Sequence, residues 1–515
     1  MQLCDHQVHS SCWIYNPYLR LRQFMHLLSK RPLRTDQKYF WVVFLVLLSV
    51  YLLFAVYHHV STQYQDTNID FRINFGSPNP AIRGFLGGDE PHYLIEVRSI
   101  VEHGTLDLTK AYQELNWPRN YWQVLAGSRP GALPWHSIGL PILLMMPYLV
   151  AGVFGTMAFM CVVTAAVGAH VFGLSNSIVR DPRYALVCAL IFGVLFLLPF
   201  SSQIYPDMAA SLIAIVVVRK IFVQFQWSEK GLALTGGLIG FSILLNPKNI
   251  VLFAVPFFYV VFLLIIRKRG RALIAFAIPF LAFLLLYCYY TWYYFGSIFL
   301  SPYTLSYRFD FNFTSNGVLG LLVDREHGVL AYFPALYLGF FGLTVSARRF
   351  GWRVILVGLM CVMFYGLNAF FLDLKQAATT AGREILPLIV LWSAPFSTAF
   401  VLFCKKWWFR ICACSLVAVT AVFSVAMTWD RLLGMLGMLY TVANSVLGED
   451  VGGFWPVFGT VFCNWHFCPV PFRPYDYLFV AAFVGYTLLV TVLAGRVSPD
   501  LLGSIAECGE RSDKD

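Results

Sequence analysis

Residues 249–291, NIVLFAVPFFYVVFLLIIRKRGRALIAFAIPFLAFLLLYCYYT, contain two long apolar runs separated by a basic turn. A helix that crosses the hydrocarbon core of a bilayer needs about 20 apolar residues, and such runs recur from Tyr39 almost to the end of the chain. Of the 515 residues, 58% are hydrophobic and 12% are charged, whereas soluble domains are about half apolar and about a quarter charged. The sequence therefore predicts an all-α polytopic membrane protein.

The apolar runs predict about 12 transmembrane helices. Their approximate ranges are 39–58, 155–177, 184–200, 207–225, 231–246, 249–266, 272–291, 331–346, 353–372, 385–404, 410–428 and 477–495. The apolar segment Ile138–Val150 is too short to span a bilayer and carries Pro141 and Pro147. We expect this segment to be re-entrant or interfacial.

The distribution of charge predicts the orientation. With the N-terminus inside, 24 of the 37 Lys and Arg residues lie on the cytoplasmic side, and 18 of the 27 Asp and Glu residues lie outside. Basic residues favour cytoplasmic loops, so both termini are expected to be cytoplasmic. The outer side then carries three long loops, 59–137, 292–330 and 429–476. Because the net charge of +10 comes from short inner loops, it does not indicate nucleic-acid binding.

The predicted organisation has four parts. They are a cytoplasmic segment, 1–38, a main transmembrane region, 39–404, a group of C-terminal transmembrane helices, 405–495, and a cytoplasmic tail, 496–515. The first segment is too long and mixed for a signal peptide, so the first span is expected to be a signal anchor. Because functional residues concentrate on loops held by a rigid scaffold, we expect the outer face of a plasma (inner) membrane to be the working face.

One pair of cysteines, Cys463 and Cys468, lies in an outer loop. Such a pair suits a disulfide in an oxidising compartment. Together with His466 it would also suit a metal site, for which no further ligands can be identified from the sequence. Both interpretations remain open.

The first outer loop contains GGDEPHYL at residues 87–94. Pro91 suits the first position of a helix, and Asp89 or Glu90 would then cap it. Apolar residues follow at helical spacing, which predicts an amphipathic helix on the membrane surface. The positive end of that helix would favour ionised carboxylates, as a general base requires. A helix cap alone would also explain this pair of acids.

Other charged and histidine side chains lie at the outer ends of predicted spans. Each is by itself an ordinary interfacial residue, but together they would gather around one cavity on the outer side. They are His136 before the re-entrant segment, Asp207 at the start of the fourth span, Lys248 in the turn 246–249, Arg325 and His327 at the end of the second long loop, and Arg383 at the start of the tenth span.

These features resemble the glycosyltransferase C superfold, and in particular protein O-mannosyltransferases and lipid A aminoarabinose transferases. The resemblance rests on the Asp-Glu pair, a His-x-x-Gly-Leu-Pro motif at residues 136–141, the acid that opens the fourth span, and Gly382-Arg383. It covers most of the chain by topology, through short motifs.

The resemblance implies an inverting enzyme of the cell envelope. It would transfer a hexosyl or pentosyl group from a polyprenyl-phosphate donor to a hydroxyl group of a lipid, glycan or protein, on the periplasmic or outer face. Asp89 would be the general base or would orient the acceptor, and Glu90 and Asp207 match the other catalytic acids of the family.

The departing phosphate would need positive charge, because negative charge develops on it in the transition state. The fixed fork of donors on an arginine suits this role. The candidate substrate-binding residues are Arg383, Lys248, Arg325, His92, His136 and His327. The histidines and carboxylates would also suit a divalent metal, although no clear ligand spacing is evident.

Two other classes of membrane protein share the span count and the basic inner loops. A transporter or lipid flippase commonly has repeats and ionisable residues near mid-membrane, whereas here these residues gather at loop ends. A polymerase of lipid-linked sugars typically has basic residues in a later outer loop. The aromatic run 287–295 suits an interfacial belt or a stacking surface for the substrate.

Overall fold

The computed structural model describes most of the region between residues 35 and 424. The described residues are 35–65, 89–115, 124–125, 131–223, 228–298, 320–323, 329–370, 382–405, 410–411, 413–422 and 424. This part is almost entirely helical, as predicted. Its one sheet pairs two short antiparallel strands, β1 (Val124–Leu125) and β2 (Leu133–Pro134).

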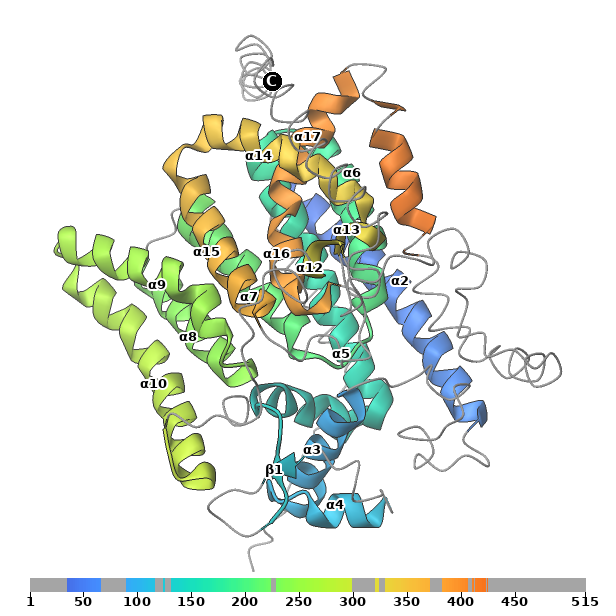
Figure 1. Ribbon diagram of the computed structural model, residues 1–515, viewed down its shortest axis with the longest axis vertical. Helices are drawn as coiled ribbons and strands as arrows, with labels where there is room; N and C mark the ends of the chain where they lie inside the picture. Colours follow the sequence, from blue (N-terminus) through green and yellow to red (C-terminus); the bar gives the residue numbers. More distant parts are fainter. Residues whose placement is uncertain are drawn as a thin grey trace, which may run out of the picture.

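Long helices form a bundle that makes up most of the described molecule (Figure 1). They are α2 (Thr35–Gln65), α5 (Gly139–Val179), α6 (Pro182–Phe192), α7 (Pro206–Val218), α8 (Glu229–Leu245), α9 (Asn249–Ile266), α10 (Gly270–Phe295), α14 (Tyr337–Phe350), α15 (Trp352–Ala369) and α17 (Ser393–Lys405). The shorter α-helices are α3 (Glu90–His103), α4 (Thr109–Glu114), α12 (Gly320–Val323), α13 (Val329–Tyr332) and α16 (Leu386–Leu391).

Short 3₁₀ and π turns join or extend several of these helices. The π turns are η4 (Gly193–Leu197) and η6 (Arg219–Val223), and the 3₁₀ turns are η5 (Leu198–Phe200), η7 (Pro334–Leu336) and η9 (Arg383–Ile385).

Within the described residues, six helices are long and apolar enough to cross a membrane. The number is up to seven if Arg383–Leu391 and Ser393–Val401, which meet at 47°, form one bent span. The expected number of about 12 spans is therefore not confirmed by the described part of the chain. Several predicted spans coincide with helices that are too short or are interrupted by π or 3₁₀ turns, such as α7 followed by η6. The last predicted span, 477–495, lies outside the described residues.

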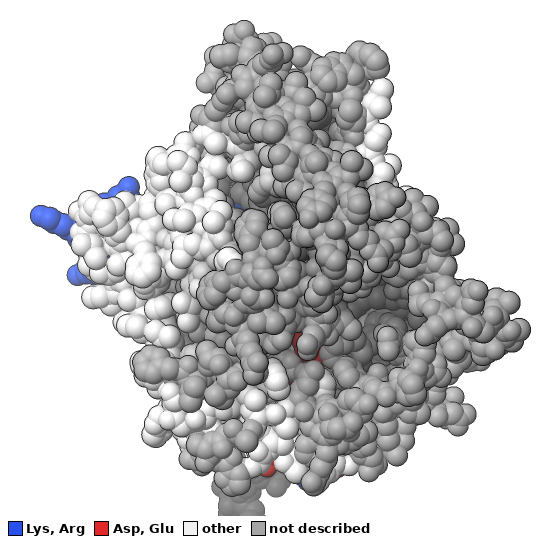
Figure 2. Space-filling view, viewed as in Figure 1, with Lys and Arg blue, Asp and Glu red and all other residues white. Residues whose placement is uncertain are grey.

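The surface of the bundle is apolar where helices face outward. Leu53 on α2, Phe258 on α9, Leu285 on α10 and Val362 on α15 are each between 65% and 72% exposed. Figure 2 shows few charged side chains on the described part of one face, apart from a basic group at the tip of α9 and α10. Extensive exposed apolar surface suits lipid rather than water. The chain is therefore a multi-pass helical membrane protein.

Glycines allow the close helix contacts that such a bundle requires. A Cβ atom at Gly236 on α8 would collide with the carbonyl oxygen of Phe276 on α10, and one at Gly240 would lie 2.8 Å from the carbonyl oxygen of Phe280. Small residues four apart commonly let transmembrane helices approach in this way.

The apolar segment Ile138–Val150 is a helix that is set apart from the rest of α5 by a kink. Ala151 and Gly152 interrupt the helix with φ values of −148° and +56°. The kink separates this segment from the helix that follows it. Its re-entrant or interfacial position remains a prediction.

Helices α3 and α4 and strand β1 are grouped at one end of the bundle (Figure 1). Most residues of α3 are buried, including Glu90–Val97, and the helix packs against α5. Helix α3 is therefore a buried element of the group formed by α3, α4 and β1, and not an exposed surface helix. The reason is that its polar side chains find charged partners inside the protein.

Candidate active site

Five of the predicted site residues meet in one cluster at the ends of helices. They are Asp89 before α3, His136 before α5, Asp207 in the first turn of α7, Lys248 between α8 and α9, and Arg383 in η9 before α16. The expectation that side chains distant in the sequence gather on one side is therefore met for these five. Arg325 and His327 lie outside the described residues.

Asp89 stands at the N-cap position of α3, but its side chain makes no capping hydrogen bond. Of the two expected capping residues, Asp89 or Glu90, Asp89 therefore occupies the N-cap position, but its side chain does not cap the helix. Instead, Oδ1 lies 3.6 Å from His136 Nε2, and Oδ2 lies 3.6 Å from Arg383 Nη1. The side chain remains 30% exposed. The carboxylate is thus held between two cationic partners and is accessible to a substrate.

Arg383 is the central cation of the cluster. It follows Gly382, whose φ of +78° lies in the left-handed region that favours glycine. The guanidinium carbon lies 4.0 Å from the centre of the Tyr205 ring, a favourable cation–π arrangement. Nη2 donates a hydrogen bond of 2.7 Å to Glu384. Nη1 and Nε make no hydrogen bond within the described part of the chain, but they face Asp89 at 3.6 Å and Asp207 at 3.9 Å.

Lys248 links the two other acids of the cluster. Its Nζ donates a hydrogen bond of 2.6 Å to Glu384 Oε2 and lies 3.3 Å from Asp207 Oδ1. It also donates to Asn368 Oδ1 at 3.4 Å. Arg383 Nε lies 3.9 Å from Asp207 Oδ2. Acids and bases therefore alternate across the cluster, as charges in a buried site must.

His136 lies between two carboxylates. Its Nδ1 is 3.1 Å from Glu96 Oε1, on the opposite side of the ring from Asp89. Burial alone would lower the pKa of His136, but hydrogen bonding and the negative charges of Asp89 and Glu96 raise it to about 9. Burial would raise the pKa of Asp89, but His136 and then Arg383 hold it well below the ordinary value. The favoured state is an imidazolium beside an ionised Asp89.

His92 and Glu90 lie beside the ion-pair cluster. Burial and the charge of His136 lower the pKa of His92 to about 3, and its Nδ1 is hydrogen-bonded to Tyr112 Oη at 2.6 Å. Glu90 Oε1 accepts a hydrogen bond of 2.8 Å from the backbone N–H of Ile204. This bond ties the start of α3 to the segment that leads into α7. A catalytic role for Glu90 stays a prediction.

Three polar residues of the site were not predicted as site residues: Glu96, Glu384 and Asn368. Glu96 follows Asp89 by seven residues, which places both on one face of a helix. Glu384 is adjacent to Arg383, so a charged pair at the start of an apolar run was an available signal. No sequence pattern indicated Asn368 as a site residue, because only helix packing brings α15 close to Lys248.

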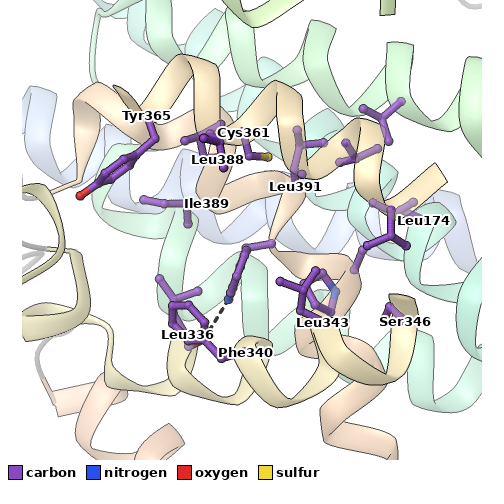
Figure 3. A pocket seen from close by; sticks show the side chains of 18 of the residues that line it. Leu174, Leu336, Phe340, Leu343, Ser346, Cys361, Tyr365, Leu388, Ile389 and Leu391 are labelled. Atoms are coloured by element: carbon purple, nitrogen blue, oxygen red, sulfur yellow. Dashed lines mark hydrogen bonds between the residues drawn. The ribbon is translucent and has the colours of Figure 1, made fainter. Parts of the chain in front are cut away.

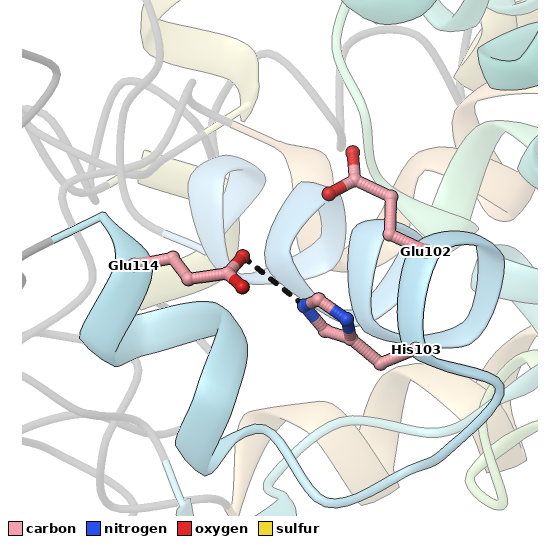
Figure 4. Close-up of side chains that lie close together, drawn as sticks. All are labelled: Glu102, His103 and Glu114. Carbon is pink, nitrogen blue, oxygen red and sulfur yellow. Dashed lines mark hydrogen bonds and ion pairs between the residues drawn. The ribbon is translucent and has the colours of Figure 1, made fainter.

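A possible metal-binding group lies away from this cluster, on α3 and α4 (Figure 4). Among the described residues, Glu102, His103 and Glu114 place potential ligand atoms within 4.8 Å of one another. Arg98 already pairs with both carboxylates, at 2.7 Å and 3.4 Å. These side chains therefore form an ion-pair network between the two helices.

The main cluster was also expected to suit a divalent metal. The guanidinium of Arg383 lies between Asp89 and Asp207, at 3.6 Å and 3.9 Å. Among the described residues, both carboxylates therefore face a cation of the protein. A divalent metal at this cluster remains a prediction.

An apolar cavity of about 560 Å³ is lined in large part by residues of α14, α15 and α16, and by none of the five clustered residues. Figure 3 shows side chains of α14, among them Phe340 and Leu343, facing those of α15 and α16 across it. Two of its lining residues are close in sequence to residues of the charged site. Ile385 belongs to the same turn as Arg383, and Tyr365 lies one helical turn before Asn368. A charged site and an apolar cavity therefore share the same two helices.

No protein-family model matches the chain, and no curated protein matches it. Among solved structures, it is similar to the archaeal oligosaccharyltransferase AglB from Archaeoglobus fulgidus in complex with an inhibitory peptide and a dolichol-phosphate. The identity is 14% and the TM-score 0.38, over 79% of this chain and 56% of that one.

Two further structures of the Archaeoglobus fulgidus oligosaccharyltransferase are similar at 14% identity. The apo form has a TM-score of 0.37 and covers 76% of this chain and 55% of that one. The complex with Zn and sulfate has a TM-score of 0.38 and covers 74% and 53%. The chain thus spans little more than half the length of these structures.

At this identity and TM-score, the likeness carries no argument for activity.

Proposed function

We propose that the protein is an inverting membrane glycosyltransferase. It transfers a sugar from a polyprenyl-phosphate donor to a hydroxyl group of a lipid, glycan or protein on the extracytoplasmic face. One observation carries the proposal: a partly exposed carboxylate, Asp89, lies 3.6 Å from the guanidinium of Arg383, and the turn that holds Arg383 also contributes Ile385 to the lining of an apolar cavity. A base, an anion site and a lipid site are the three parts that this reaction needs.

The transfer step uses Asp89 at the acceptor. The acceptor oxygen attacks the anomeric carbon and forms the new glycosidic bond, while its proton passes to the carboxylate of Asp89. The bond between the anomeric carbon and the phosphate oxygen breaks on the opposite face, and its electron pair stays on the polyprenyl phosphate. Attack from the face opposite the leaving group inverts the configuration. A general base positioned in this way typically contributes about 10²–10⁴-fold to the rate.

Arg383 stabilises the departing phosphate. Its Nη1 amino group, which faces Asp89, suits one oxygen of the phosphate, because a fixed positive charge there compensates the negative charge that develops on the leaving group. A phosphate there competes with Asp89 for the cation, which lowers the positive charge beside the carboxylate. Asp89 then becomes a stronger base at the moment when the donor is in place. Lys248 and Glu384 hold Arg383 and Asp207 in position through their ion pairs.

The apolar cavity suits the prenyl chain of the donor. Its volume of about 560 Å³ lies within the usual range for ligand pockets, and its lining reaches Ile385, next to the phosphate site. A lipid tail in this cavity would bring its phosphate to Arg383.

The experiment that tests this function compares wild type with Asp89→Asn. The purified protein is reconstituted in liposomes with radiolabelled polyprenyl-phosphate sugars and hydroxyl acceptors. We expect wild type to transfer the sugar and Asp89→Asn to lose at least about 100-fold in rate, since the amide cannot accept the proton. Glu102→Gln, on the outer part of the same helix, serves as the matched control and should keep full activity.

Two results would contradict the proposal. One is wild-type activity in a folded Asp89→Asn protein. The other is movement of an intact lipid-linked sugar across the bilayer with no new glycosidic bond, which would identify a flippase or transporter.

A further inference from the structure

Glu96 is a buried carboxylate that the proposed transfer step does not use. It lies on α3, two turns beyond Asp89, and its side chain is 1% exposed. Oε1 lies 3.1 Å from His136 Nδ1, whereas Oε2 makes no hydrogen bond within the described residues. A buried ionisable group is costly unless a partner compensates it. His136 is the partner that the structure provides.

His136 connects Glu96 to the candidate base. Its Nδ1 faces Glu96, its Nε2 lies 3.6 Å from Asp89 Oδ1, and its ring packs against Tyr93 with ring centres 4.4 Å apart. The backbone that follows is also fixed, because Gly139 lies so close to the backbone of α8 that a Cβ atom would collide with it. The imidazole is therefore held between two carboxylates with little freedom to turn.

We propose that Glu96 is a positioning residue that orients and charges His136, and thereby holds Asp89 in place for the acceptor. The partner of one imidazole nitrogen determines the orientation and protonation of the other. With Glu96 on Nδ1, the Nε2–H group points at Asp89. This inference rests on the proposed function, since it assigns a role within the same site.

The charges around His136 support a defined pH dependence. Burial lowers its pKa, but Asp89 and Glu96 raise it from 6.5 to about 9. Burial raises the pKa of Glu96, with His136 opposing this effect. His92 of α3 faces the ring as a neutral group, Tyr290 of α10 lies near Glu96, and Arg383 of η9 acts on the other side of Asp89. The imidazolium is thus present below about pH 9 and is lost above it.

The test is the pH–rate profile of Glu96→Gln in the reconstituted transfer assay. The wild-type rate should fall as the pH rises through about 9. Without the negative charge of Glu96, this alkaline limb should move to lower pH by at least about one pH unit, because a nearby opposite charge shifts a pKa by roughly 1–3. Glu102→Gln, whose side chain is 38% exposed on the same helix, should leave the limb in place. An unchanged limb in Glu96→Gln would overturn the inference.

A double-mutant cycle separates positioning from a structural role. If Glu96 acts through His136, adding Glu96→Gln to His136→Gln should cause no further loss of rate. A further loss equal to that of the single variant would refute the inference. If Glu96→Gln does not fold, Glu96→Asp takes its place, with the same expected downward movement of the limb because the shorter side chain weakens the contact.

A measurement without substrate keeps the two proposals distinct. The titration of His136 is followed by NMR in nanodiscs with ¹³C-labelled histidine, and His136→Gln identifies its signal. A lower midpoint in Glu96→Gln than in wild type supports the pairing even if no donor is used, in which case the proposed function alone fails. An unchanged midpoint in an active enzyme refutes the role of Glu96 alone.

Discussion

The ionisation and basicity of Asp89 are set by residues that are distant in the sequence, and not by the helix that it precedes. Its carboxylate turns away from the helix amides toward His136 and Arg383. Both partners carry positive charge, so they keep Asp89 ionised and lower its basicity. A substrate phosphate that engages Arg383 would reverse part of that effect. At the scale of single residues, the proposed donor binding and base strength would therefore be coupled through one guanidinium.

Arg383 carries the prediction at this scale. In Arg383→Ala, we expect the rate of transfer to fall about 10²–10³-fold, as when a donor to a developing negative charge is removed. The donor Michaelis constant should rise, and that of the acceptor should change little. Arg383→Lys keeps the charge but loses the planar fork, so it should recover only part of the rate. Steady-state kinetics with varied donor and varied acceptor measure both effects.

Arg98→Ala is the control for this prediction, because Arg98 is an outer cation that pairs only with acids of α3 and α4 among the described residues. It should keep the kinetics of wild type. Unchanged donor kinetics in Arg383→Ala would remove Arg383 from the phosphate site.

At the scale of elements, α15 and the pair η9–α16 contribute residues to both the apolar cavity and the charged site. Tyr365 on α15 and Ile385 in η9 line the cavity, whereas Asn368 and Arg383 on the same elements contact the ionic cluster. A rigid helix keeps residues one turn apart about 5 Å from each other. The spacing between a bound phosphate and its tail would therefore be set by these helices.

Gly358 on α15 tests the use of the cavity. It lines the cavity, and a Cβ atom there would meet no atom within 4 Å among the described residues. Gly358→Phe should fill part of the space without disturbing the helix. We expect the Michaelis constant for an undecaprenyl-phosphate sugar to rise roughly tenfold, the equivalent of about 1.4 kcal/mol of lost binding. The constant for a farnesyl-phosphate sugar should rise less, because the shorter chain needs less of the cavity.

Gly366→Phe provides a matched control on the same helix. A Cβ atom at Gly366 also meets no described atom within 4 Å, but this residue does not line the cavity. Equal effects of the two substitutions on both donors would show that the cavity does not hold the prenyl chain.

At the scale of the whole molecule, helices α3 and α4 lie at one end of the described structure. The basic tip of α9 and α10 lies away from them (Figure 1). Basic loops favour the cytoplasm. The candidate site, which includes the residue before α3, would then face the periplasm or exterior. This orientation and the cytoplasmic location of both termini remain predictions.

Cysteine labelling tests the orientation. The native cysteines are replaced by serine, and Lys110→Cys on α4 or Arg269→Cys between α9 and α10 is introduced. In intact cells, a membrane-impermeant maleimide should label Lys110→Cys and should reach Arg269→Cys only after the membrane is permeabilised. The reverse pattern would place the site on the cytoplasmic side. Retained sugar transfer in the serine background is the control for correct folding.

The helices were predictable because their signals are local. Each predicted span up to residue 428 overlaps a described helix, and the predicted span 249–266 coincides with α9. The number of crossings was less predictable, since hydropathy does not register a π turn such as η6 or a bend of 47° between two short helices. The predicted loop 429–476, with Cys463 and Cys468, lies outside the described residues.

The sequence by itself determined that this chain is helical, apolar and basic on its short loops, and it singled out Asp89, Asp207, Lys248 and Arg383 at span ends. These properties follow from composition and short-range spacing. Only the tertiary structure decided which charges pair, that Asp89 does not cap its helix, and that Glu96 lies against His136. The physical reason is that ion pairs between residues 40 to more than 100 positions apart depend on helix packing, which no local pattern encodes.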